Sequence, residues 1–208
     1  MPLIIREELP NGKLWGLWKI EEDIHTLYKL LAPGEVDLHK YHQITHPDKQ
    51  KEFLASRNAI KLLLESAGHT YPGTTSDQWG RAFLAGSPFH ISLSHSHGYA
   101  AAILCPQGKT GIDIELIQDK VLRIRGKYLK PEEMTDDYET ATLYWCVKEV
   151  MYKIYSARQL SLKDEIHLIN TEKGHHHGII TAKMDPEPEK IFHLHYRIID
   201  HHAIVFPV

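Results

Sequence analysis

The spacing of apolar positions predicts two helices in the first third of the chain. In residues 21–31, apolar side chains recur at intervals of three and four, and Pro33-Gly34 follows as a stop signal. A longer segment, residues 49–68, repeats apolar positions on one face and stops at Gly68. We therefore expect two amphipathic helices here, each covering part of a core.

Short apolar or alternating segments bounded by turn residues predict antiparallel strands further along. Residues 69–89 mix Pro, Gly, Ser and Thr and are expected to form loops. The two segments after them are separated by a His97-Gly98 turn, as in a hairpin. The predicted strands occupy residues 90–96, 99–105, 111–117, 167–170, 179–184, 192–199 and 203–208.

Residues 137–159 carry the strongest helix pattern of the chain. The apolar stripe consists of Leu143, Val147, Val150, Met151 and Ile154. A short helix is also expected at residues 121–129, ended by Pro131. Each half thus offers helix plus antiparallel strands, which predicts an α+β fold with an N-terminal half, 1–106, and a C-terminal half, 107–208.

Composition narrows the class of protein. With 42% apolar residues in 208, the chain can bury a proper core. It has no apolar run of 18 residues, and charges interrupt its N-terminal hydrophobes, so we expect neither a membrane span nor a secretory signal. Two cysteines outside any CxxC pair favour the reducing cytoplasm. The net charge of -3 argues against a nucleic-acid-binding domain, for which a pI above about 9 is typical.

The segment GIDIEL, residues 111–116, places two carboxylates in an apolar strand. Asp113 and Glu115 share one face of a strand, with Cα atoms about 7 Å apart. Two anions at this spacing repel each other unless protons, basic side chains or a cation compensate them. A half-exposed strand with polar outer positions is the alternative interpretation.

The long helix carries a second polar pattern. Trp145, Glu149 and Lys153 lie at i, i+4 and i+8 and share the face opposite the apolar stripe. Alone, they could be an exposed Glu-Lys pair that contributes about 0.2 to 0.5 kcal/mol to helix stability beside an amphipathic tryptophan.

Together the two patterns suggest a cation site. If the helix crosses the end of the strand, Glu149 meets Asp113 and Glu115, and three carboxylates suit Mg²⁺, which also binds substrate phosphates. Mn²⁺ could replace Mg²⁺ at oxygen ligands. Lys153, one helical turn further on, could reach the same phosphates.

Ser94 and His95 add a hydroxyl and an imidazole at a strand end. They could hold a phosphate oxygen, or they could be ordinary hairpin residues. The adjacent serine and histidine do not indicate a serine hydrolase, because GxSxG is absent. The GHHHG segment, residues 174–178, is a candidate metal site by composition. A polar hairpin turn is expected instead, since consecutive histidines on a turn point in different directions and no cysteine completes a zinc site.

Three motifs in order resemble those of one family, the 4'-phosphopantetheinyl transferases of the larger, surfactin-synthetase-activating (Sfp) type. They are Ser94-His95-Ser96, Gly111-Ile112-Asp113-Ile114-Glu115, and Trp145-Cys146-Val147-Lys148-Glu149 with Lys153. Upstream, the helix around Arg57 is similar to one in the family, and Gly80-Arg81-Ala82 stands where the family often has Gly-Lys-Pro. Ala82 departs from the Gly-Lys-Pro pattern. His97, directly after the Ser-His-Ser motif, is a second departure, because many relatives have Gly there.

The resemblance implies a pseudodimer of two similar α/β halves, each with an antiparallel sheet and a long packed helix, with coenzyme A in the cleft between them. It implies transfer of the 4'-phosphopantetheine group of coenzyme A to a serine of an apo acyl or peptidyl carrier protein, releasing adenosine 3',5'-bisphosphate. A monomer is expected, since a pseudodimer closes its own cleft.

The resemblance also assigns roles to residues. Asp113, Glu115 and Glu149 would bind Mg²⁺, and Glu149 and Lys153 would be catalytic, with Glu149 as the base. The residues expected to contact coenzyme A are Arg57, Arg81, Ser94, His95, Lys148 and Lys153. Two other functions stay open: a catalytically weak protein of the same fold that only binds coenzyme A or a carrier, and a Mg²⁺-dependent phosphohydrolase.

Overall fold

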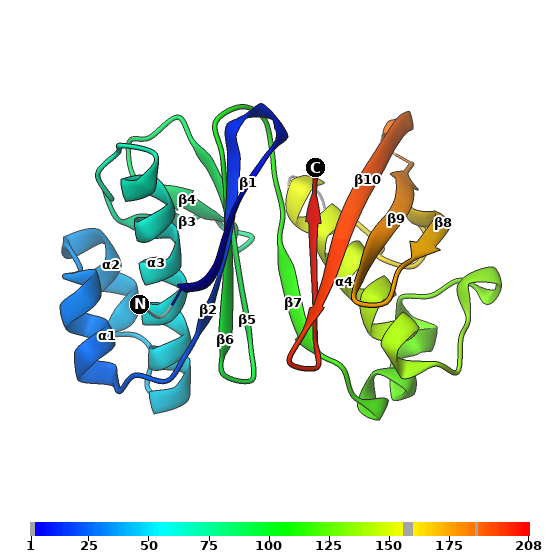
Figure 1. Ribbon diagram of the computed structural model, residues 1–208, viewed down its shortest axis with the longest axis horizontal. Coiled ribbons are helices and arrows are strands. Elements are labelled where there is room, and N and C mark those ends of the chain that lie inside the picture. The colour runs from blue at the N-terminus through cyan, green and yellow to red at the C-terminus, as the bar shows by residue number, and fades with distance from the viewer. Residues whose placement is uncertain (1–2, 156–159, 186) are drawn as a thin grey trace. The chain divides into compact units, whose positions relative to one another are not determined.

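The computed structural model describes residues 3–155, 160–185 and 187–208, and it divides into two compact units, Met1–Thr110 and Gly111–Val208 (Figure 1). The fold is mixed α+β with antiparallel sheets, and the described residues contain four α-helices. None of the helices in this part of the chain is both long enough and apolar enough to span a membrane.

The first unit combines a four-stranded antiparallel sheet with three helices. The sheet order is β1-β2-β6-β5, and β3 and β4 form a separate two-stranded sheet. The elements are β1 (Leu3–Leu9), β2 (Lys13–Lys19), α1 (Ile24–Leu31), α2 (Glu35–Tyr41), α3 (Pro47–Ser66), β3 (Thr74–Ser76), β4 (Ala82–Leu84), β5 (His90–Ser96) and β6 (Tyr99–Cys105).

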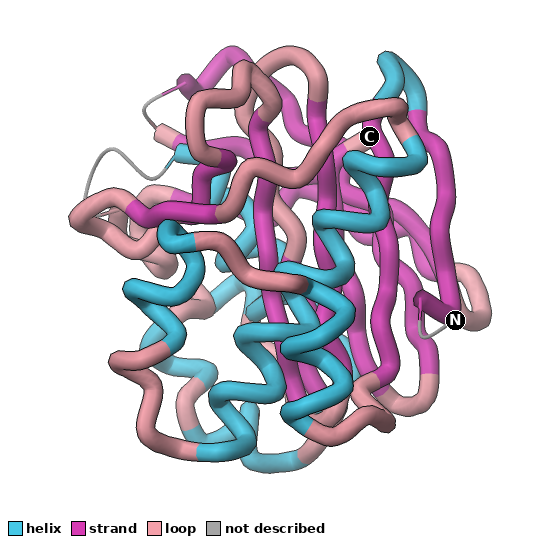
Figure 2. The backbone as a smooth tube through the Cα atoms, turned by 90° about the vertical axis from the view of Figure 1, so that its left-hand side faces the viewer, coloured by secondary structure: helices cyan, strands magenta, loops and turns pink. Residues whose placement is uncertain are grey.

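Helix α3 lies on one face of this sheet, with α1 packed against α3, and Figure 2 shows the helices in front of the strands. Both predicted helices are confirmed as α1 and α3. The side chain of Asp23 caps α1 by accepting a hydrogen bond from the Thr26 backbone N–H at 2.7 Å. The expectation of loop throughout residues 69–89 is wrong, because β3 and β4 form within it.

The second unit is one helix against a five-stranded antiparallel sheet of order β7-β11-β10-β9-β8. Its elements are β7 (Asp113–Leu116), three short 3₁₀ helices η2 (Asp119–Arg123), η3 (Arg125–Lys127) and η4 (Pro131–Glu133), α4 (Tyr138–Tyr155), β8 (Ile166–Lys173), β9 (His177–Met184), β10 (Glu187–Ile199) and β11 (His202–Pro207). The predicted strands and long helix are confirmed. The expected helix at 121–129 is replaced by 3₁₀ turns, and positions 156–159 of the long helix lie outside the described residues.

The local backbone geometry requires glycine at two positions, Gly98 and Gly111. His97 and Gly98 both have positive φ, 41° and 85°, as a two-residue hairpin turn between β5 and β6 requires. A Cβ on Gly111 would lie 2.7 Å from the backbone oxygen of Val150, so a glycine is needed where α4 approaches the start of β7. The glycine of the GIDIE motif therefore serves helix packing.

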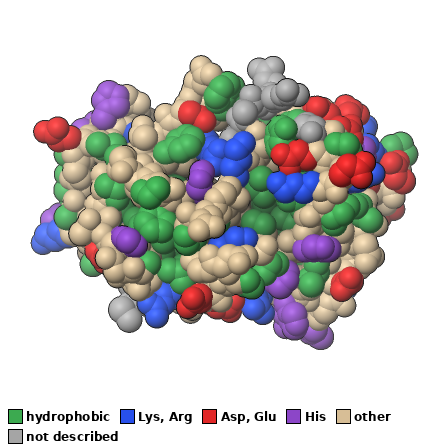
Figure 3. Space-filling view, turned by 90° about the horizontal axis from the view of Figure 1, so that it is seen from above, with side chains coloured by type: hydrophobic (Ala, Val, Ile, Leu, Met, Phe, Trp, Pro, Cys, Tyr) green, Lys and Arg blue, Asp and Glu red, His purple; other side chains and the backbone are tan. Residues whose placement is uncertain are grey.

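The surface carries charges of both signs. On the face shown in Figure 3, acidic, basic and histidine side chains are interspersed rather than gathered into one patch of a single sign. This mixture agrees with the small net charge of -3.

Candidate functional site

The two carboxylates of the GIDIE strand point toward helix α4. Strand β7 pairs with β11 so that Asp113 lies opposite Val205 and Glu115 lies opposite Ala203. Both partners belong to the core beneath α4, and directly opposed residues share a face, so the carboxylates face α4 as well. Asp113 is only 4% exposed, which makes compensation of its charge necessary.

Lysine 153 supplies that compensation. Its Nζ lies 2.8 Å from Asp113 Oδ1 and donates a second hydrogen bond to the backbone oxygen of Ile112 at 2.9 Å. The last turns of α4 and the beginning of β7 are thus joined by an ion pair. Of the two alternatives for Lys153, the structure excludes a simple exposed Glu-Lys helix pair.

Glutamate 149 completes the acidic cluster. The pKa of its carboxyl is raised from 4.5 to about 7, chiefly by burial and next by the charge of Asp113, with Glu115 adding to the rise and Lys153 opposing it. Glu149 is therefore close enough to both strand carboxylates to feel their charges. The acidic cluster is defined here as Asp113, Glu115 and Glu149, with Lys153 as its cation.

A cysteine that no sequence pattern singles out for chemistry also faces this cluster. Cys146 is fully buried one helical turn before Glu149 and Val150, and its thiol contacts the Ala203 backbone oxygen at 3.8 Å. Burial, followed by the charges of Asp113 and Glu115, raises the pKa of the thiol well above its usual value. The thiol stays protonated and is not a candidate nucleophile.

The donor atoms of the acidic cluster suit a hard divalent cation. All three side chains offer carboxylate oxygens, the preferred ligands of Mg²⁺, and a cation would relieve the mutual repulsion that raises the pKa of Glu149. Among the described residues, however, no three His, Cys, Asp or Glu side chains already converge on one point. Lys153 forms an ion pair with one of the Asp113 oxygens instead. The cluster therefore has the ligand types that Mg²⁺ prefers, but the carboxylates are not arranged as a coordination shell.

An apolar hollow of about 390 Å³ opens beside Glu115. Its lining includes Val121, Ile124 and the Trp145 ring, with Lys120 and Arg123 adding positive charge. Trp145 is held by an edge-to-face contact with Tyr128, whose ring centre lies 5.0 Å away. The tryptophan of the helix motif thus forms a wall of this hollow.

The expectation that Lys148 contacts coenzyme A is corrected by its surroundings. The side chain is fully buried, and its Nζ lies 2.6 Å from Glu133 Oε2 and 3.0 Å from the Ile166 backbone oxygen. Burial lowers the pKa of this ammonium, and Glu133 opposes the change. Lys148 offers no surface to a ligand.

Arg57, in the first unit, is also buried, and it lies close enough to Lys40 to affect the pKa of that lysine. Its guanidinium donates to Thr74 Oγ1 at 3.1 Å and lies 3.8 Å above the Phe53 ring. Burial lowers its pKa to about 10. Burial, and next the Arg57 charge, lowers the pKa of Lys40, whose Nζ donates to Ser76 Oγ at 2.8 Å. No sequence pattern singles out Lys40, because a lysine near the end of a helix is common.

The remaining predicted residues of the first unit lie on β5 and beside the β3–β4 turn. Ser94 and His95 point to opposite faces of β5, and His95 Nδ1 lies 3.1 Å from Glu52 Oε2 on α3. The Arg81 guanidinium lies 5.0 Å from the Phe83 ring centre, and burial lowers its pKa. All three side chains are exposed or half-buried and can reach a ligand.

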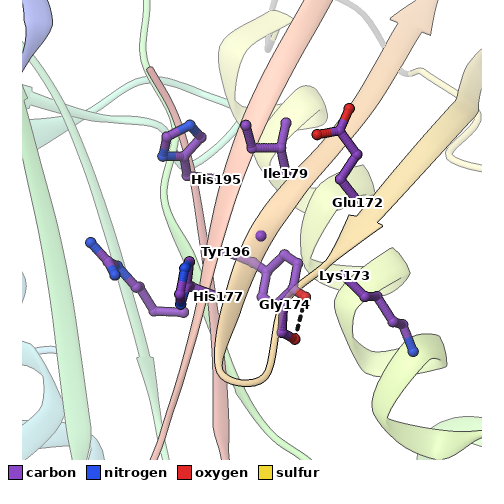
Figure 4. Close-up of a pocket in the computed structure, with 9 residues that line it drawn as sticks. Glu172, Lys173, Gly174, His177, Ile179, His195 and Tyr196 are labelled. Carbon is purple, nitrogen blue, oxygen red and sulfur yellow. Dashed lines mark hydrogen bonds between the residues drawn. The ribbon is translucent and has the colours of Figure 1, made fainter.

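A second hollow, of about 540 Å³, adjoins the histidine-rich turn between β8 and β9 (Figure 4). The turn itself is confirmed as a hairpin, closed by a hydrogen bond from Gly174 N–H to the His177 backbone oxygen at 2.9 Å. His177 and His195 line the hollow from neighbouring strands, and the Tyr196 hydroxyl donates to the Gly174 backbone oxygen at 3.4 Å. Its lining contains none of the residues predicted to act in catalysis, to bind the cation or to contact coenzyme A.

The raised pKa of Glu149 predicts a pH-dependent stability. Because the folded protein keeps this proton up to about pH 7 while the unfolded chain releases it near pH 4.5, its stabilising effect is complete below about pH 4.5 and is lost as the pH rises through 7. Relative to Glu149→Gln, wild-type protein should lose up to about 3 kcal/mol between pH 4.5 and 8.

Urea unfolding at several pH values, without divalent cations, measures this difference. The exposed Glu132→Gln variant is the matched control and should follow the wild-type curve. Parallel curves for wild type and Glu149→Gln would show that Glu149 titrates normally.

Comparison with known proteins leaves the chain without an assigned relative. No model of a protein family matches the sequence, and the search of curated proteins finds no similar protein.

Proposed function

We propose that this protein is a 4'-phosphopantetheinyl transferase of the Sfp type, with holo-acyl-carrier-protein synthase activity. The observation that carries the proposal is the gathering of Asp113, Glu115, Glu149 and Lys153, from β7 and α4, into one acidic cluster with a cation. The Ser94-His95-Ser96, GIDIE and WCVKE motifs supply the resemblance.

The reaction is a displacement at phosphorus. The serine Oγ of the carrier forms a bond to the phosphorus next to the pantetheine arm of coenzyme A. The bond from that phosphorus to the bridging oxygen of the pyrophosphate breaks, and adenosine 3',5'-bisphosphate leaves with the electron pair. The serine proton passes to a base, and the nucleophile comes from the partner, so no activated serine is needed in this chain.

Asp113, Glu115 and Glu149 would hold the divalent cation. When bound, Mg²⁺ or Mn²⁺ supplies positive charge that stabilises the pyrophosphate oxygens. Lys153 adds an ammonium group, held in place by Asp113 and the Ile112 backbone oxygen. Positive charge fixed in advance is the main requirement of phosphoryl-type transfer.

Glu149 is the proposed base. Before a cation binds, its carboxyl has a pKa of about 7 and can exchange a proton near neutral pH. A bound cation favours the ionised form, so binding of Mg²⁺ should release protons near pH 7.

The nucleotide part of coenzyme A is assigned to the first unit. Burial, and next the charge of Arg57, lowers the pKa of Lys40, and a phosphate group would relieve the repulsion between these two cations. Arg81, Ser94 and His95 keep their predicted role as contacts of coenzyme A. Lys148 is removed from that set because its ammonium is buried against Glu133.

The carrier protein is assigned to the hollow beside Glu115. Its apolar floor and the basic Lys120 and Arg123 suit the acidic helical surface of an acyl or peptidyl carrier protein. The proposal also takes the two units as the halves of a pseudodimer in a monomeric, cytoplasmic protein.

Intact-mass spectrometry of an apo carrier protein incubated with this protein, coenzyme A and Mg²⁺ tests the function. We expect the carrier to gain about 340 Da, the mass of one transferred phosphopantetheine group. EDTA and a carrier lacking its serine are the controls, and both should abolish the gain.

Two other outcomes would contradict the proposal. Tight binding of coenzyme A without modification of any of several carrier types would favour the binding-only protein. Breakdown of coenzyme A that needs no carrier would favour the phosphohydrolase.

A further inference from the structure

Lys148 and Glu149 are neighbours on α4 but face different surroundings. Successive residues of an α-helix point about 100° apart. Lys148 turns toward η4 and β8 and is fully buried, whereas Glu149 turns toward the carboxylates of β7. The direction of one side chain therefore determines the direction of the other.

The partners of Lys148 form a hydrogen-bonded network around it. Glu133 Oε2 accepts hydrogen bonds from Lys148 Nζ at 2.6 Å and from the Lys130 backbone N–H at 3.0 Å. Glu133 Oε1 accepts one from the Leu168 backbone N–H at 3.0 Å, and Lys148 also donates to the Ile166 backbone oxygen. One ion pair thus connects α4 to both η4 and β8.

This network constrains the rotation of α4 about its axis. A buried ion pair contributes little net stability, since the loss of hydration offsets much of the attraction, but its geometry is demanding. Turning α4 by one residue would leave an ammonium and a carboxylate buried apart, which is strongly unfavourable. On another side of α4, Gly111 packs against Val150 with no space for a side chain.

We propose that Lys148 is a positioning residue, whose buried ion pair with Glu133 sets the rotation of α4 and thereby directs Glu149 and Lys153 to β7. The inference rests on the proposed function in so far as Glu149 and Lys153 are residues of the site. The lysine of the WCVKE motif then acts through Glu149 and touches no ligand.

The double variant Glu133→Gln/Lys148→Met tests this role. It removes both charges and nearly preserves the side-chain volumes, so no unpaired charge is buried. Lys148→Arg, which keeps the charge, is the conservative variant. Lys163→Met is the matched control, because Lys163, in the same unit, donates to the Gly126 backbone oxygen at 2.9 Å and forms no ion pair with the described residues.

Two readouts separate positioning from folding. The first is the nuclear Overhauser contact between the Gly111 Hα protons and the Val150 methyl groups, which reports how α4 lies on the start of β7 without any ligand or turnover. The second is carrier modification, measured as kcat and as KM for coenzyme A.

We expect the folded double variant to lose the Gly111–Val150 contact and about a hundredfold in kcat, with little change in KM, because a small misplacement of catalytic groups has that effect. Lys148→Arg should keep most of both signals, and Lys163→Met should keep all of them. A folded double variant with the contact and kcat unchanged would overturn the inference, and so would one that does not fold at all. If wild-type protein modifies no carrier, the proposed function fails, and the Overhauser contact alone still decides the positioning role.

Discussion

Replacing Lys148 by methionine alone is expected to lower the free energy of unfolding by about 3 to 5 kcal/mol, the usual effect of breaking a buried ion pair by removing one partner. The methionine fills nearly the same volume, so a cavity is not the cause. Glu133 would keep its two backbone hydrogen bonds but lose the ammonium 2.6 Å away, while remaining only 8% exposed. An uncompensated buried carboxylate is what makes the single variant costly.

Urea unfolding of the two single variants and the double variant measures this effect. The Glu133→Gln/Lys148→Met variant should lose less than the sum of its two single changes, because neither charge is left alone. Lys163→Met should stay within about 0.5 kcal/mol of wild type. If the two single changes simply add in the double variant, then the 2.6 Å contact contributes no coupling energy and the ion pair is not what fixes α4.

The second large effect is on turnover. Glu115→Gln should lower the rate of carrier modification by at least about a hundredfold, the scale of losing one charge contact in the transition state. Its folding should remain intact, since the change removes one of three carboxylates that repel each other in the acidic cluster. The steady-state rate at saturating coenzyme A and Mg²⁺ is the quantity to measure.

Glu172→Gln is the control for this experiment, because Glu172 is an exposed carboxylate of the same unit on β8. Its rate should equal that of wild type. A folded Glu115→Gln protein with normal turnover would remove Glu115 from the site. Lys153 is less suitable for such a test, because its loss would leave the carboxylate of Asp113, which is 4% exposed, without its ammonium partner and reduce stability as well.

Most of the fold could be predicted from the sequence because its signals are local. The apolar repeat of α3 and α4, the alternation in β5 and β7 and the continuous apolar run of β6 depend on neighbouring residues alone. The elements that escaped prediction are β1, β2, α2, β3, β4 and the 3₁₀ turns, and all of these except β1 and β2 are too short for a periodic pattern. A helix of two turns or a strand of three residues is stabilised by what it packs against, which sequence spacing does not reveal.

The candidate site divides in the same way. Sequence spacing by itself determined that Asp113 and Glu115 share one face of a strand and that Glu149 and Lys153 share one face of a helix. Only the tertiary structure decided that the two faces meet, that Lys153 neutralises Asp113, and that burial raises the pKa of Glu149. The tertiary structure also decided that Lys148 is buried and contacts no ligand, because Glu133 and β8, which are distant from it in sequence, pack against its side chain. Backbone periodicity is a property of neighbours along the chain, whereas burial and charge pairing depend on segments brought together by folding.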